Sequence, residues 1–316
     1  MVTKVVEVMN CSSSCCGGGN DNGDYTGGSE MMAILVITMT MVMKVVVMEG
    51  WWMLVVVVVA FSASINWVER GAPLPVRRQI GNTCFAVAVV DVTASARHIY
   101  YGEKLVALVA QEILDCIPWN TKKGGSEIMA YDYIYRHGIA LEMYYPYIGV
   151  KGKYKKSRKF HSPRVSIDGY WEITAGNEYE MSRILQYHPI TVAIACHRSF
   201  DLYKGGLYKP PRFLFELDMV KLSDESNLED HPLLEFHEIS LVGIGTYNGE
   251  PAWLIKNSWG KQWGVGGYAY VSRNRSYVGA LGINCWPSYP IIGDHERYEK
   301  PRLYKPPAGV IFPKKD

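Results

Sequence analysis

The stretch from Cys84 to Tyr101 restricts the fold of this chain more than any other part of the sequence. An uninterrupted apolar run from Phe85 to Val90 follows the cysteine, and Gly102 stands at the far end as a stop signal. Asn82 and Thr83, which precede the cysteine, are both of favoured N-cap types. The sequence therefore predicts one buried helix with Cys84 in its first turn.

A cysteine in that first turn has an unusual electrostatic setting. A free thiol has a pKa of about 8.5, and only its thiolate is a strong nucleophile. A helix dipole favours negative charge at the helix N-terminus, and a neighbouring imidazolium would lower the thiol pKa further. Cys84 is therefore a candidate nucleophile that needs a histidine nearby.

His237 and Asn257 are the candidate partners of Cys84. His237 precedes one apolar run, and a second run leads into Asn257, with the pair Asn248-Gly249 between the two. Such a pair between apolar runs predicts a hairpin of antiparallel strands, which would bring the two side chains close. An asparagine carboxamide can accept the imidazole N–H and aim the other ring nitrogen at sulfur, as the third member of a triad.

Each of these residues also has an ordinary structural explanation. A single cysteine in an apolar helix is usually a small buried hydrophobe, and a lone histidine before a strand indicates little. The joint pattern of cysteine, histidine and the sequence Asn-Ser-Trp-Gly at residues 257–260 favours a functional site. His231 is an alternative base, but no strand-like run follows it.

This pattern resembles the papain-like cysteine peptidase family across residues 66–290, about 70% of the chain. His237 and Asn257 follow Cys84 by 153 and 173 residues, against about 130–150 in the family, and an insertion explains the excess. The matching segments are Asn66–Gly71, Pro75–Val76, Gln111–Cys116, Gly124–Gly125, Tyr145–Tyr147, Tyr203–Gly206, Asn257–Gly260 and Ser288–Pro290.

The resemblance implies an α+β fold of two lobes with substrate in the cleft between them. A helical lobe, residues about 67–170, would surround a central helix that starts at Cys84. The other lobe, residues about 176–290, would be built on a twisted, barrel-like antiparallel sheet. The whole peptidase domain would span residues 66–292.

The resemblance also implies a cysteine-type endopeptidase that acts in protein catabolism. The Cys84 thiolate would attack a peptide carbonyl and form a thioester, and His237 would protonate the leaving amine. The backbone N–H of Cys84 and the carboxamide of Gln79 would hold the oxyanion. The implied substrate-binding residues are Gly125, which pairs with the substrate backbone, and Ser126, Glu127, Ile128, Ala193 and Trp259. If Glu127 faces the pocket for the second residue before the cut, a basic side chain should be accepted there.

Several departures from the family pattern support a second hypothesis. The loop from Gln79 to Cys84 is one residue shorter than usual, which leaves the reach of the carboxamide open. Glu238 follows His237, and a carboxylate there could raise the imidazole pKa or compete for its N–H. An acidic insertion at residues 213–236 is expected to be a solvated loop. The alternative is a catalytically impaired homologue that binds peptides or proteins.

The seven cysteines also depart from the family, whose lobes usually carry disulfides. Cys116 lacks its expected partner, and Cys196 and Cys285 are interpreted as buried structural residues, with a bridge between them left open. Lost disulfides argue against an oxidising compartment, while an apolar stretch near residue 55 fits export. The prediction leans to the secretory route and leaves the compartment open.

Both ends of the chain differ from the central part. Residues 1–30 have low complexity and are expected to be disordered, and residues 293–316 form an expected flexible tail. Residues 31–65 hold two apolar runs, neither of which reaches the roughly 18–20 residues that cross a bilayer. An internal signal or anchor, an ordered apolar arm and a mistaken gene start all remain open, and so does membrane contact through residues 31–61. No stretch resembles the charged helical prosegment of the family.

The overall charge indicates no particular partner. The 316 residues carry a formal net charge of +2, and the basic run at residues 151–159 is expected to be a solvated loop, so nucleic acid is not predicted. No metal and no organic cofactor are implied. The expected partners are peptide or protein substrates and proteinaceous inhibitors of cysteine proteases, and a monomer is expected.

Overall fold

The structure is a computed structural model, and its description covers six ranges of the chain. These are residues 46–48, 51–53, 64–153, 163–211, 235–273 and 277–293. Several expectations concern residues outside these ranges: the disordered start at 1–30, most of the apolar segment 31–65, His231 with nearly all of the acidic insertion, and the tail after residue 293.

The chain divides into two units, residues 1–63 and residues 64–316. In the first unit, strand β1 (Val46–Met48) pairs with strand β2 (Trp51–Met53) in antiparallel fashion. Across the ranges that are described, no helix has both the length and the apolar character needed to cross a bilayer.

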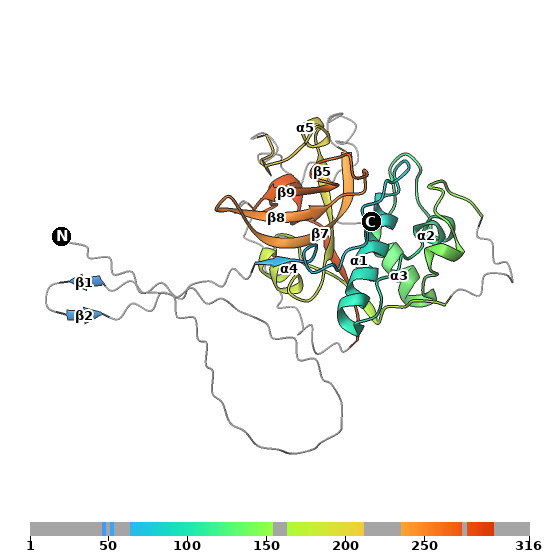
Figure 1. Ribbon diagram of the computed structural model, residues 1–316, viewed down its shortest axis with the longest axis horizontal. Helices are drawn as coiled ribbons and strands as arrows, with labels where there is room; N and C mark the ends of the chain where they lie inside the picture. Colours follow the sequence, from blue (N-terminus) through green and yellow to red (C-terminus); the bar gives the residue numbers. More distant parts are fainter. Residues whose placement is uncertain are drawn as a thin grey trace, which may run out of the picture. The chain divides into compact units, whose positions relative to one another are not determined.

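The second unit has a helical lobe and a sheet lobe (Figure 1). The helical lobe contains helices α1 (Cys84–Tyr101), α2 (Ala110–Cys116) and α3 (Glu127–His137) and the short 3-10 helix η1 (Glu142–Tyr144). Helices α4 (Glu178–Ile184) and α5 (Arg198–Asp201) belong to the sheet lobe. The α+β, two-lobed fold predicted from the sequence is confirmed.

Helix α1 has the predicted bounds, and its residues are buried from Cys84 to Ala96. It ends at Gly102, whose left-handed backbone (φ 64°) satisfies the last turn through a hydrogen bond to the His98 carbonyl. Thr83, one of the two N-cap candidates, is the N-cap residue at the other end, but its side chain makes no capping hydrogen bond. The Thr83 hydroxyl donates to the Ile80 carbonyl at 3.0 Å instead of accepting a helix N–H.

The sheet lobe is built on one sheet whose strands follow the order β4-β10-β5-β7-β8-β9-β6, with β3 added beside β7. Every pairing is antiparallel except that of β6 with β9, which is parallel. The strands are β3 (Ile65–Asn66), β4 (Gly169–Glu172), β5 (Ile190–Cys196), β6 (Leu207–Tyr208), β7 (Glu235–Tyr247), β8 (Glu250–Lys256), β9 (Tyr268–Ser272) and β10 (Pro287–Ile291).

The β7–β8 hairpin confirms the predicted pair of strands. Its turn residues Asn248 and Gly249 both have positive φ, 49° and 81°, which is the backbone of the tight turns that follow the twist of a hairpin. Because the hairpin is antiparallel, Tyr247 lies opposite Glu250 and Ser240 lies opposite Lys256. The start of β7 and the end of β8 therefore lie at the same edge of the lobe.

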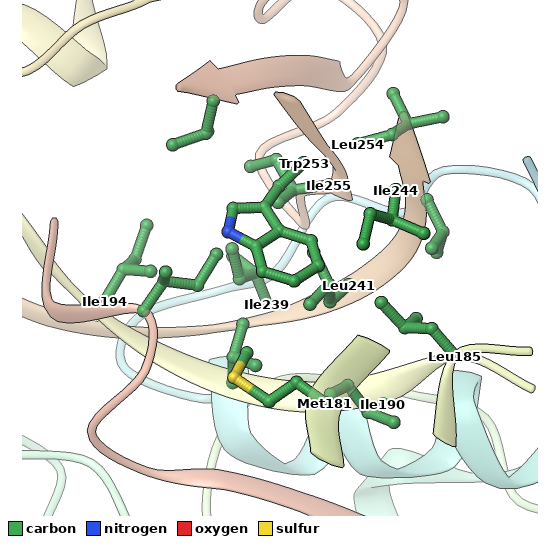
Figure 2. Packing of buried hydrophobic residues seen from close by; sticks show 14 of the residues in the cluster. Met181, Leu185, Ile190, Ile194, Ile239, Leu241, Ile244, Trp253, Leu254 and Ile255 are labelled. Carbon is green, nitrogen blue, oxygen red and sulfur yellow. The ribbon is translucent and has the colours of Figure 1, made fainter. Parts of the chain in front are cut away.

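Each lobe has its own apolar core. In the sheet lobe, the indole of Trp253 is 1% exposed and sits among aliphatic side chains from several strands and from α4 (Figure 2). Those labelled around it in Figure 2 are Met181, Leu185, Ile190, Ile194, Ile239, Leu241, Ile244, Leu254 and Ile255. In the helical lobe, α1 supplies Phe85 and Val89 to a core that α2 and α3 complete. Cys84 and His237 are therefore held by different cores, Cys84 by that of the helical lobe and His237 by that of the sheet lobe.

Two segments pack in the lobe opposite to the one that their place in the sequence suggests. Trp67 packs in the sheet-lobe core and donates its indole N–H to the Leu185 carbonyl at 2.8 Å. The helical lobe was expected to begin at about residue 67, but its core begins at Leu74. At the other end, Ile292 follows the last strand and is buried in the helical-lobe core.

Candidate active site

His237 and Asn257 meet at the edge of the sheet lobe where β7 begins and β8 ends. His237 is the third residue of β7, and its Nε2 lies 2.7 Å from the Asn257 Oδ1. The backbone N–H of Ser258 donates to the same oxygen at 2.7 Å, which identifies that atom as an acceptor. The ring therefore donates through Nε2, and its Nδ1 is left as an acceptor.

Trp259 covers this pair. Its ring stacks on the His237 ring with 4.6 Å between centroids and 26° between planes. Trp263 packs edge-on against Trp259 at 5.4 Å and is itself 6% exposed. Since the His237 and Asn257 side chains belong to residues only 4% and 2% exposed, the hydrogen bond between them is shielded from water.

Cys84 is the first residue of α1 and is 8% exposed. The backbone N–H groups of Glu238, the residue after His237, of Phe85 and of Cys84 itself act to lower the pKa of its thiol. The sulfur of the helical lobe therefore lies against the strand that carries His237. Among the described residues, no hydrogen bond joins this sulfur to the His237 ring.

The surroundings of Cys84 and His237 shift both pKa values towards the neutral forms. Burial raises the pKa of the Cys84 thiol to about 12; the three backbone N–H groups oppose this rise, and the charge of Glu238 adds to it. Burial lowers the pKa of His237 to about 4, while the hydrogen bond to Asn257 acts in the opposite direction. Burial of both groups therefore favours a thiol and a neutral imidazole.

Gln79 is anchored to the segment that follows Asn257. Its backbone N–H donates to the Ser258 carbonyl at 2.7 Å, and its Oε1 accepts from the Ser258 hydroxyl at 2.6 Å. Its Nε2 donates one hydrogen to the Gly81 carbonyl at 2.6 Å. These hydrogen bonds fix the Gln79 carboxamide. Because a carboxamide nitrogen carries two hydrogens, one N–H is left for another acceptor.

Gly125 lies directly against the ring of Phe85, the residue after Cys84. A Cβ added at Gly125 would come within 2.6 Å of that ring, which only glycine avoids. Beside it, the Asn82 side chain donates to the Thr121 and Lys122 carbonyls at 3.2 and 2.6 Å. The Gly124–Gly125 segment is thus held next to the start of α1.

The other residues expected to bind substrate lie on both lobes. Ser126 caps α3 by accepting the Met129 N–H at 3.4 Å, and Ile128 in the same turn is half-buried. Glu127 is only 2% exposed. Ala193, on β5, is 8% exposed and pairs with Glu238 on β7. Burial is the main cause of the raised pKa of the Tyr131 hydroxyl, and the charges of Glu238 and Glu127 raise this pKa further. Two acidic residues therefore share one buried region at the boundary of the lobes.

The described cysteines are all free thiols: Cys84, Cys116, Cys196 and Cys285. Cys196 and Cys285 are buried, as predicted, and the bridge between them that the sequence left open is not formed. Burial raises the pKa of Cys285 to about 12, and burial also raises the pKa of the half-buried Cys116.

Two roles in this region were not predicted from the sequence. Ser258 ties Gln79 to Asn257, and the only sequence signal was its place beside the asparagine. Lys256, the residue before Asn257, is 3% exposed and pairs with Asp91 of α1. A lysine at the end of an apolar run was the available signal, since a buried charge needs a partner.

A cysteine at the start of a buried helix in one lobe and a histidine–asparagine pair on the sheet of the other define the two-lobed class of cysteine proteases. The family model for papain family cysteine proteases matches residues 61–291. The chain belongs to this family, the papain family.

Similar proteins are found in plants and beyond. Zingipain-2 of Zingiber officinale is 32% identical over 233 residues, which are 72% of this chain and 96% of zingipain-2. Cysteine proteinase RD21A of Arabidopsis thaliana is 33% identical over 234 residues, and this chain covers 46% of its length.

Solved structures agree with the fold. A Carica candamarcensis cysteine protease, CMS1MS2, in complex with E-64 has a TM-score of 0.62 at 29% identity, and the match covers 74% of this chain and all of that one. The bromelain protease of Ananas comosus, also in complex with the E64 inhibitor, has a TM-score of 0.62 at 31% identity, with 73% and 100% covered.

Proposed function

We propose that this protein is a cysteine-type endopeptidase that hydrolyses peptide bonds through Cys84, His237 and Asn257 and acts in protein catabolism. The single observation that carries the proposal is the 2.7 Å hydrogen bond from the buried His237 ring to Asn257. The backbone N–H of the next residue on the strand, Glu238, also acts to lower the pKa of the Cys84 thiol. The bond to Asn257 assigns a donor role to one ring nitrogen and an acceptor role to the other. A ring held in this way is suited to act as a base.

The reaction begins from the neutral pair. The difference between thiol and imidazole pKa values makes prior formation of a separated thiolate unfavourable in the free site. His237 Nδ1 therefore accepts the thiol proton as the sulfur attacks the peptide carbonyl, and the positive charge on the ring is offset by the negative charge developing on the carbonyl oxygen.

Two N–H groups beside the start of α1 are the proposed donors to the oxyanion. The backbone N–H of Cys84 lies in the first turn of α1, where helix N–H groups have no partner within the helix. The second N–H of Gln79 supplies the other donor, with Ser258 fixing the carboxamide. Preorganised donors of this kind typically contribute about 10²- to 10³-fold in rate.

The thioester forms when the tetrahedral intermediate collapses. The carbon–nitrogen bond breaks, the imidazolium of His237 gives its proton to the leaving amine, and the acyl group stays on sulfur. His237 then takes a proton from water, whose oxygen attacks the thioester carbonyl, and the thiol is restored as the acid product leaves. Peptide or protein chains are the proposed substrates, and proteinaceous inhibitors that occupy the same region are proposed partners.

Glu127 is proposed to select a basic side chain at the second residue before the cut. The proposal is supported by the burial of Glu127 and Glu238, which both act on the Tyr131 hydroxyl, and by the pairing of Glu238 with Ala193 across two strands. Matched peptides with arginine or leucine at that residue test it. The arginine peptide should have the higher kcat/KM, and the preference should shrink in Glu127→Gln. A clear leucine preference in the wild type would exclude this role for Glu127.

A non-catalytic peptide-binding module is the second candidate, because burial and the charge of Glu238 both oppose ionisation of Cys84. Turnover of a fluorogenic dipeptide by the wild type, with Cys84→Ala as control, separates the two functions. An epoxide that reacts with thiols adds an independent readout. Selective labelling of Cys84 over Cys116 and Cys285 supports catalysis, whereas equal slow labelling without turnover supports the binding module.

A further inference from the structure

A buried ion pair joins the two lobes close to the candidate active site. The Lys256 ammonium at the end of β8 contacts the Asp91 carboxylate in the middle of α1, and these side chains are only 3% and 5% exposed. They come from residues 165 positions apart. The pair therefore links the helix that begins with Cys84 to the strand that leads into Asn257.

Asp91 lies on the same face of α1 as Cys84. Asp91 follows Cys84 by seven residues, close to two full turns, so both side chains lie on the same face of the helix about 10 Å apart along its axis. Cys84 meets β7 at one end of this face, and Asp91 meets β8 further along. Two contacts on one face fix both the axial position and the rotation of a helix against a sheet.

Arg77 extends the link to the segment that carries Gln79. Its Nε lies 3.1 Å from the Asp91 Oδ1, and its Nη1 lies 3.1 Å from the Glu142 Oε1. The Arg77 carbonyl also accepts the Gly260 N–H at 2.9 Å. Lys256 and Arg77 are thus paired with Asp91 and Glu142 where the lobes meet. The backbone of Arg77 also ties this cluster to the segment that follows Asn257.

Such an arrangement favours a role in alignment. Burying a charge pair removes both ions from water, so the pair adds little net stability compared with apolar packing, and its best-attested use is to fix register. Among the described residues, no hydrogen bond or ion pair joins Asp91 or Lys256 to the Cys84 sulfur or the His237 ring. Asp91 follows Cys84 on α1, and Lys256, the last residue of β8, directly precedes Asn257.

We propose that Asp91 and Lys256 are positioning residues, whose ion pair sets the register of the Cys84 helix against strand β8, which leads into Asn257. This inference rests on the proposed peptidase function. Loss of the pair lets α1 shift along the sheet, and the sulfur leaves its aligned position although the fold persists.

The test compares Asp91→Asn, Lys256→Gln and the double variant with the wild type on a fluorogenic dipeptide. A misplacement of about 1 Å can lower a rate by about 10²-fold, so each single variant should lose about 10- to 100-fold in kcat per folded molecule, with KM changed less than about twofold. The double variant should lose no more than the worse single variant, because both substitutions break one contact.

A matched control uses a second buried ion pair that lies within one helix. Glu180 pairs with Arg183 in α4 at 2.6 Å, and the Glu180 side chain is 5% exposed. Glu180→Gln should lower the Tm in thermal unfolding and leave kcat unchanged. If Asp91→Asn lowers the Tm in the same way and keeps the wild-type kcat, the pair is merely structural and the inference is wrong.

Two further measurements test the inference if Asp91→Asn does not fold or if the wild type shows no turnover. Should Asp91→Asn not fold, Lys256→Arg keeps the charge and changes its reach; a folded Lys256→Arg with wild-type kcat would overturn the inference, and a lowered kcat supports it. The alkylation rate of Cys84 by iodoacetamide across pH should also fall in Asp91→Asn. Because that readout needs no peptide hydrolysis, a wild type without turnover would contradict the proposed function alone.

Discussion

Asn257→Ala tests how strongly the asparagine supports His237. The substitution removes the oxygen that accepts the His237 Nε2–H at 2.7 Å and the Ser258 N–H at 2.7 Å. Both donors belong to residues that are 4% and 6% exposed. A buried donor without an acceptor costs about 1–3 kcal/mol, so the free energy of unfolding should fall by at least about that amount.

The effect on catalysis should be larger on kcat than on KM. During the reaction His237 becomes an imidazolium, and a hydrogen bond from a charged donor contributes about 1.5–3 kcal/mol. That range corresponds to about a 10- to 150-fold loss of kcat. Asn257 does not lie where a substrate side chain is expected, so KM should change little.

The assay is turnover of a fluorogenic dipeptide, normalised to folded protein, together with urea unfolding. Asn177→Ala is the matched control, because Asn177 is 9% exposed in the same lobe and its Oδ1 accepts the Glu180 N–H at 3.1 Å as the cap of α4. It should lose about 1 kcal/mol of stability and no activity. A kcat within threefold of wild type for Asn257→Ala would refute the reasoning about His237.

Three further outcomes are expected. Ser258→Ala should lower kcat because Gln79 loses the donor that fixes its carboxamide, and Gln79→Ala should lose about 10²- to 10³-fold; unchanged turnover in both would exclude the oxyanion role. The pKa of His237 is about 4 in the folded protein, against 6.5 for an unperturbed histidine, so the unfolded state alone gains a proton as pH falls through this window. Stability should therefore drop by about 3 kcal/mol, at 1.36 kcal/mol per unit, and His237→Gln should remove this drop in urea unfolding. Trp253→Ala should cost about 3–5 kcal/mol by the same assay, and a loss below about 1 kcal/mol would contradict its central place in the core.

The parts of the structure that the sequence predicted are those specified by neighbouring residues. The helix from Cys84 to Tyr101 follows from one apolar run and a stop glycine, and the hairpin follows from two runs around Asn248 and Gly249. Resemblance to the papain family supplied the two lobes and their order. The bounds of α1 agree because both of its ends are marked locally.

The parts that the sequence did not predict depend on contacts between distant segments. Thr83, one of the two predicted N-cap candidates, does occupy the N-cap position of α1, but its hydroxyl bonds to the Ile80 carbonyl and to the Tyr147 hydroxyl at 2.6 Å instead of to a helix N–H. Asp91 and Lys256 appear in the sequence as single charges in apolar runs, and a buried charge requires a partner. Which residue is that partner depends on how the lobes meet, and no local pattern records it.

The exchange of chain ends between the two cores bears on how the protein folds. Trp67 belongs to the sheet lobe although it precedes the helices, and Ile292 belongs to the helical lobe although it follows the last strand. A fragment that contained only one lobe would lack either Trp67 or Ile292, and the apolar surface that this residue covers would be exposed to water. Neither lobe can therefore complete its own core, and the two lobes should fold and unfold as one cooperative unit.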